Sequence, residues 1–144
     1  MDVDSILSDF ERLKAACLEM ESKKILIGIV GGADSDVVKI ALGHEYGVPG
    51  KLPERSFIRA SFDQDQEKLG GIIDGAMEKV MQGTLSPDGA AASIGAQSAQ
   101  LVQNFIDENR VKPPSDFSKK TQQTTLYETG THIRDRIAYK VVKG

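Results

Sequence analysis

The clearest pattern of apolar and polar positions lies in the last part of the printed sequence, between Thr124 and Val142. Apolar side chains there tend to fall on every second position, with Arg or Lys between them, which is typical of a strand with one buried face. Asp135 interrupts the apolar row, so the packed part of the strand is predicted to begin at Ile137. The apolar positions are Ile133, Ile137, Tyr139 and Val141, and the basic ones are Arg134, Arg136 and Lys140.

A strand needs a partner, and the sequence offers one far upstream. Lys24 to Val30 (KILIGIV) is short, rich in β-branched residues and followed by Gly31-Gly32. We therefore predict an α+β fold in which these two distant segments pair in a small antiparallel sheet. An N-terminal helix, a long helical hairpin and an extended loop are expected to pack on this sheet or to project from it.

Apolar residues at steps of three and four predict the helices. Asp2 to Met20 carries such a stripe, and a second helix is expected from about Asp36 to Tyr46, ended by Gly47. Asp34 or Ser35 is the predicted N-cap of this second helix. The stripe of the first helix consists of Val3, Ile6, Leu7, Phe10, Leu13, Cys17 and Met20.

Two further helical patterns predict the hairpin. The first runs through Leu52–Gln82, starting at Pro53 and Glu54, and a bend or close packing is expected near Gly70, Gly71 and Gly75 because glycine weakens a helix. Ser86-Pro87 is a typical N-cap and first helical position, and it opens a helix to about Asn109. The short turn 83–85 makes the two helices antiparallel. The residues predicted to face inward on the second are Ile94, Leu101, Val102, Phe105 and Ile106.

The regular patterns stop between the hairpin and the last strand. Val111 to Thr124 has two prolines and no apolar period, so we predict an extended loop or arm over 111–124. A segment of this length without regular structure is usually functional or ordered by a partner. A turn at Glu128-Thr129-Gly130 follows, in which Gly130 supplies the positive φ.

Composition is that of an ordinary globular chain. The 144 residues are expected to form one domain, 1–144, with 27% charged and 40% apolar residues. No run is long enough to span a bilayer, and the acidic start MDVDSILSDF is unlike a basic signal peptide. The single cysteine, Cys17, excludes an internal disulfide, and its place on a helical stripe predicts a small buried hydrophobe rather than a nucleophile.

The net charge of −3 is unevenly distributed along the chain. From Arg110 onward there are eight Lys/Arg against three Asp/Glu, or +5, whereas the preceding part has ten against eighteen, or −8. Neither part is extreme enough to predict nucleic-acid binding, and the acidic balance argues against it. The charges either form solvated faces or meet when identical subunits pack head to tail.

Two stretches suggest chemistry without supporting it. GIVGGADSD lacks the Lys-Ser/Thr of a P-loop and the glycine spacing of a dinucleotide site, and its aspartates would repel phosphate. In His44-Glu45-Tyr46-Gly47 a zinc helix would need a second histidine at Val48, so a structural role at a helix end is expected. We predict no catalytic, cofactor or metal residues. A small soluble enzyme or ligand-binding protein that uses the Gly31-Gly32 loop stays open as the alternative.

Four sequence motifs, taken in order, resemble those of a known family. IGIVGG is followed by ALGHEYG, then LPERSFIRASFD, a long helix pair, a Pro-Pro loop and LYETGTHIRDRIAYKVV. This order is similar to that of the virion morphogenesis and neck or tail-completion proteins of tailed bacteriophages, and it covers nearly the whole chain after the first helix. Glu128 and Asp135-Arg136 depart from the family's usual residues. The positions that correspond to the family's motifs, with Glu128 in place of the usual Asp, are Tyr46, Gly47, Pro53, Arg55, Phe57, Arg59, Leu126, Glu128, Thr129, Gly130, Ile133, Arg134, Ile137 and Tyr139.

The resemblance implies a structural subunit rather than an enzyme. It would form a homo-oligomeric ring, a hexamer or dodecamer, at the head–tail junction of the virion after assembly in the host cytoplasm. Its neighbours would be neck, tail-terminator or connector proteins, and genomic DNA would pass through the lumen without sequence-specific binding, with no membrane involved. Arg55, Arg59 and Arg134 are expected in interface or local ion pairs, with a solvated helix start as the alternative for Arg55 and Arg59. Phe57 is expected to anchor the long helix, in the monomer core or at an interface.

Overall fold

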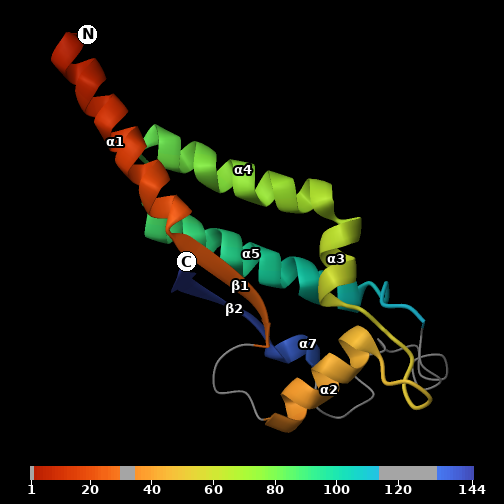
Figure 1. Cartoon of the computed structure of the whole chain (residues 1–144). Coiled ribbons are helices and arrows are strands. Elements are labelled where there is room, and N and C mark those ends of the chain that lie inside the picture. The colour runs from red at the N-terminus through yellow and green to blue at the C-terminus, as the bar shows by residue number, and fades with distance from the viewer. Residues whose placement is uncertain (1, 30–34, 114–132) are drawn as a thin grey trace.

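The computed structural model describes residues 2–29, 35–113 and 133–144, and shows an α+β fold. Strand β1 (Lys23–Ile29) pairs with β2 (Ile137–Lys143) in an antiparallel two-stranded sheet, with Ile25 opposite Val141 and Ile29 opposite Ile137. The predicted joining of two distant segments is therefore confirmed. Figure 1 shows this sheet lying along α5 (Pro87–Asp107), with β2 ending at the base of α1 (Val3–Glu21).

The helical hairpin is also present, with one difference. Helix α4 (Gln66–Gln82) turns at Gly83, which adopts the left-handed φ of 79°, and α5 returns antiparallel to it (Figure 1). The Ser86 side chain accepts a hydrogen bond from the Gly89 N–H at 3.0 Å, so the predicted N-cap is confirmed. The expected start near Pro53 is wrong, because a separate helix, α3 (Ile58–Gln64), precedes α4.

The break between α3 and α4 falls at Asp65 rather than at the glycines. Asp65 leaves the helical conformation, and each of its carboxylate oxygens accepts a hydrogen bond of 2.9 Å from the Arg110 guanidinium. This ion pair joins the break to the end of α5 and lowers the pKa of Asp65 chiefly through the hydrogen bond. Gly70, Gly71 and Gly75 lie inside an unbroken α4, and no described atom crowds them within 4 Å.

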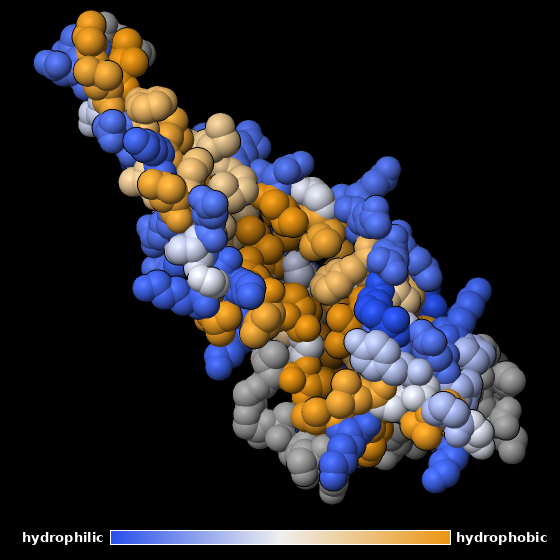
Figure 2. All heavy atoms as spheres, in the orientation of Figure 1, coloured by the Kyte–Doolittle hydropathy of each residue, from blue (hydrophilic) through white to orange (hydrophobic). Residues whose placement is uncertain are grey.

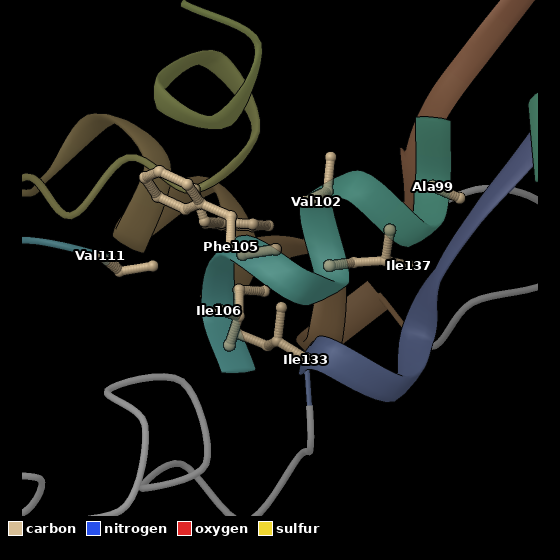
Figure 3. Close-up of a cluster of buried hydrophobic side chains, with 9 residues drawn as sticks. Ala99, Val102, Phe105, Ile106, Val111, Ile133 and Ile137 are labelled. Carbon is tan, nitrogen blue, oxygen red and sulfur yellow. The ribbon is translucent and has the colours of Figure 1, made fainter. Parts of the chain in front are cut away.

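The larger part of the core surrounds the C-terminal half of α5. Val102, Phe105 and Ile106 belong to one buried cluster with Ile133 and Ile137, which lie beyond the gap in the described residues, near the last strand (Figure 3). Val111, the first residue of the predicted loop, lies outside α5 and is also buried in this cluster. A second cluster joins α4 and α5 and receives Ala16 and Met20 from α1. The residues predicted to face inward on α5 are all buried: Ile94, Leu101, Val102, Phe105 and Ile106.

Two expectations about exposed or extended segments are wrong. Residues Ile133–Arg136 form one turn of helix, α7, rather than the start of the alternating segment. Strand β2 begins at Ile137, which confirms the predicted start of the packed part. Ile133 and Ile137 are both buried, and residues four apart lie on the same face of a helix. Residues four apart also lie on the same face of a strand, so the alternating pattern fits either structure. Cys17 is exposed rather than buried, because α1 extends away from the body of the molecule and much of its stripe meets no described segment.

Candidate functional site

The structure gathers most of the predicted site residues at one place, between the end of α2 (Ser35–Tyr46) and the start of α3. Arg134 and Tyr139 lie elsewhere, on α7 and β2. Glu128 and Gly130, with the turn predicted there, fall outside the described residues, as do most of the loop 111–124, the Gly31-Gly32 loop and Asp34. The residues brought together are Tyr46, Gly47, Pro53, Arg55, Phe57 and Arg59.

A buried carboxylate organises this cluster, and the sequence argument did not single it out. The Glu45 oxygens accept hydrogen bonds from the backbone N–H groups of Phe57, Ile58 and Arg59 at 2.9–3.0 Å. These are the free N–H groups of the first turn of α3, where a negative charge is stabilised. The Ser56 hydroxyl adds a hydrogen bond of 2.9 Å. Glu45 on α2 therefore caps the N-terminus of α3, a role that usually belongs to a side chain directly before the helix.

The electrostatics of Glu45 follow from these contacts. Burial of the carboxylate by itself raises its pKa, but the hydrogen bonds donated by the backbone of Arg59, Phe57 and Ile58 outweigh that effect. The pKa of Glu45 is therefore lowered, and the carboxylate stays ionised although its side chain is only 7% exposed. Such a carboxylate is fully engaged in holding α2 to α3 and is poorly suited to accept a substrate proton.

Arg59 covers Glu45 from the solvent side. Its Nε donates to the Glu45 carboxylate at 2.9 Å, and one terminal nitrogen donates to Glu54 at 2.9 Å. The guanidinium carbon also lies 4.4 Å from the centre of the Tyr46 ring, within the range of a cation–π contact. Arg134 forms a comparable local ion pair, with Asp107 of α5 at 2.9 Å. Both guanidinium groups therefore hold elements of the chain together.

The turn after α2 explains why glycine follows Tyr46. Gly47 has a φ of 75°, and its N–H donates to the Gly43 carbonyl at 2.8 Å. A Cβ atom at Gly47 would come within 2.8 Å of the Glu54 backbone nitrogen, so a side chain is excluded by space as well as by φ. The chain then returns, and the N–H of buried Arg55 donates to the His44 carbonyl at 2.6 Å. Phe57 follows and is fully buried in the core.

Tyr139 marks a second close contact, between the sheet and α5. A Cβ atom added to Gly95 would lie 2.4 Å from the Tyr139 ring. The ring therefore rests on the bare backbone of α5 and is still 37% exposed on its other side. This contact sets how closely β2 approaches α5.

The most exposed apolar surface is on α1, which the sequence stripe predicted as a packed face. Every residue of α1 remains at least partly exposed, although Ala16 and Met20 contact the body. Figure 2 shows hydrophobic side chains continuing along α1 to its free end. Exposed patches of this kind on a folded protein mark interaction surfaces. The residues at the free end are Val3, Ile6, Leu7 and Phe10.

The described residues offer little for chemistry or metal binding. Across 2–29, 35–113 and 133–144 there is no group of three or more His, Cys, Asp or Glu placed to hold a metal ion. Among the helices in these ranges, none is both long and apolar enough to cross a membrane.

Comparisons of the chain with protein-family models, with curated proteins and with solved structures returned no match.

Proposed function

We propose that this protein is a structural subunit that assembles into a homo-oligomeric ring in the neck or tail of a tailed bacteriophage. The ring, sixfold or twelvefold, sits at the head–tail junction around the channel through which DNA passes. This proposal rests on the ordered motifs described above, and the observation that carries its assembly part is the exposed apolar face of α1.

The site around Glu45 supports a structural role. Its charged groups bind one another: Glu45 is saturated by α3 N–H groups and Arg59, and Arg59 also binds Glu54. A catalytic carboxylate must be free to exchange a proton or to contact substrate. The HEYG and LPERSFIR motifs therefore encode a rigid corner between α2 and α3, of the kind a subunit needs to present a fixed surface to its neighbours.

The neck and tail setting adds partners to the ring itself. Neck, tail-terminator or connector proteins would contact its two faces, and DNA would pass through the lumen without sequence-specific contacts. The protein acts in the virion and assembles in the host cytoplasm. It needs no cofactor and has no enzymatic activity under this proposal.

The mass of the purified chain in solution tests the assembly part first. Light scattering and native mass spectrometry over a concentration series should show a discrete sixfold or twelvefold species, and electron microscopy should show rings with a central opening. A monomer at every concentration would contradict the ring. Thermal stabilisation of that monomer by a nucleotide or a metal ion would in addition favour a ligand-binding protein.

A further inference from the structure

The free end of α1 combines an apolar face with negative charge. Val3, Ile6, Leu7 and Phe10 lie on one side of the helix and are between 52% and 70% exposed. The segment 2–11 also contains four acidic residues and no Lys or Arg. A surface that receives this end of the helix must therefore supply apolar contact and positive charge. The acidic residues are Asp2, Asp4, Asp9 and Glu11.

A trough with these properties lies along β2. It encloses about 680 Å³ between the strand and the first turns of α5. Its apolar walls come from Tyr139, Val141 and Val142 with Ala92 of α5, and its charged residues are Lys23, Lys140, Lys143 and Asp88. Lys23 is bound to Asp88, whereas Lys140 and Lys143 are exposed and pair with no acidic residue in the described part of the chain.

The position of the trough also matters, because β2 is an edge strand. Within the described sheet β2 pairs only with β1, so its other edge is open beside the trough. An open edge is usually protected by lysines or covered by another segment. Lys140 and Lys143 prevent indiscriminate strand pairing, and an acidic helix is a covering that these lysines attract.

We propose that the free end of α1 from one copy of this chain docks in the β2 trough of the next copy. The apolar face lies along the open edge of β2, where Tyr139, Val141 and Lys143 point to one side and Lys140 and Val142 to the other. Acidic residues on the two flanks of the helix therefore each face a lysine. The proposal rests on the proposed ring and identifies the two surfaces that join neighbouring subunits.

The occupant has to be a second copy rather than the same chain. Ser22, which lines the trough, directly follows α1 in the sequence. The free end of α1 is about 28 Å away at 1.5 Å per residue and points away from the body (Figure 1). Two different patches of one molecule thus form the contact, and such head-to-tail contacts close into rings or continue as filaments.

Charge reversal tests the docking. The double variant Asp9→Lys with Glu11→Lys reverses the charge of α1 beyond its first turn. The double variant Lys140→Glu with Lys143→Glu reverses the charge of the trough. Each pair should weaken assembly by about tenfold or more in light scattering, and all four changes in one chain should restore it, because opposite charges again face one another. The control is Lys51→Glu with Lys112→Glu, which changes two exposed lysines elsewhere. It changes the net charge as much as the Lys140 and Lys143 reversals do and should not affect assembly.

The outcomes separate this inference from the proposed function. A wild type that assembles, and that assembles equally well after the Lys140 and Lys143 reversals, overturns the docking and leaves the ring standing. Failure of the four changes to restore assembly also overturns it. A wild type that is monomeric at every concentration overturns both proposals.

Disulfide trapping gives an independent readout that also detects weak assembly. In a Cys17→Ser background, Leu7→Cys and Val142→Cys together should produce a ladder of covalently linked chains under oxidation. Neither cysteine alone can link more than two chains. Efficient dimers from Leu7→Cys alone would show α1 pairing with α1 and would contradict the proposed docking, as would the absence of a ladder from the double variant.

Discussion

Helices α1 and α5 are similar in length, with 19 and 21 residues, and each carries an apolar stripe and a side-chain N-cap. Their surroundings differ completely. Helix α5 lies at the centre of the molecule, between the sheet and α4, and buries most of its stripe, whereas α1 leaves most of its stripe exposed. An apolar stripe therefore predicts that a helix has a partner, but not that the partner belongs to the same chain.

The largest expected difference concerns one phenylalanine on each helix. Phe105 of α5 is 1% exposed, and Phe105→Ala should lower the free energy of unfolding by about 3–5 kcal/mol, because it removes buried surface and leaves a cavity. Phe10 of α1 is 60% exposed, and Phe10→Ala should change it by no more than about 0.5 kcal/mol. Urea denaturation of dilute chains measures both. Equal losses would show that α1 packs within its own chain.

A polar contact inside the body should show the next largest effect. Glu45→Gln should cost about 1–3 kcal/mol at neutral pH, because a neutral amide replaces a buried carboxylate that holds α3 N–H groups. The folded-state pKa of Glu45 lies below its ordinary value of 4.5, so its stabilisation is complete above that value and is lost as the pH falls through the folded-state pKa.

The stability gap between wild type and Glu45→Gln should accordingly narrow as the pH is lowered from about 6 to about 3. Urea denaturation at several pH values provides the measurement. Glu54→Gln, at a carboxylate whose side chain is 56% exposed, is the control and should show a smaller gap. A gap for Glu45→Gln that is constant with pH would contradict the assigned role of the charge.

Glycines distinguish tight from open packing on the helical hairpin. Gly95→Ala on α5 should destabilise by about 1–3 kcal/mol, because the new methyl group would overlap the Tyr139 ring. Gly71→Ala on α4 should stabilise by up to about 1 kcal/mol, since it raises helix propensity at a site with open space. Thermal unfolding of the two variants gives the comparison, and a stabilised Gly95→Ala would refute the close approach of β2 to α5.

The two N-caps should show the smallest effect. Ser86→Ala should lower global stability by about 1 kcal/mol, because α5 unfolds only with the rest of the molecule. Asp2→Ala removes the hydrogen bond to the Ser5 N–H but should leave global stability unchanged, since the free end of α1 frays on its own. Hydrogen exchange of α1 amides, measured beside urea denaturation, should rise for Asp2→Ala alone. Equal effects of the two caps on global stability would show that α1 unfolds together with the body.

Much of the fold could be predicted from the sequence because its signals are local. The Ser86-Pro87 start of α5, its inward face, Gly47 after α2 and the strand character of two β-rich segments each follow from residue type and spacing. The pairing of the two strands follows because the sequence offers only these two strong candidates. The break at Asp65 could not be predicted in this way, because it depends on Arg110, which is distant in the sequence. The exposure of Cys17 depends likewise on where α1 lies relative to the body.

The candidate site shows the same difference between local sequence signals and contacts that form only in the folded chain. Tyr46, Gly47, Arg55, Phe57 and Arg59 were grouped by sequence, and they do lie together. The central role of Glu45 cannot be predicted in this way, because its partners are backbone N–H groups of α3. Every residue type except proline has such a group, so the residue types do not indicate the contact. The alternating pattern does not distinguish a strand from the helical turn at Ile133, because residues four apart lie on the same side of both.

The pairing of β1 with β2 also orders events during synthesis. Residues 30–136 separate the two strands in the sequence, so the sheet closes only when residues 137–143 have left the ribosome. The α1 segment emerges before β2, at a stage when the trough lined by β2 does not yet exist on that nascent chain. Under the proposed docking, a growing polypeptide can donate its helix but cannot receive one. Only a finished subunit can propagate the assembly, so incomplete chains terminate it.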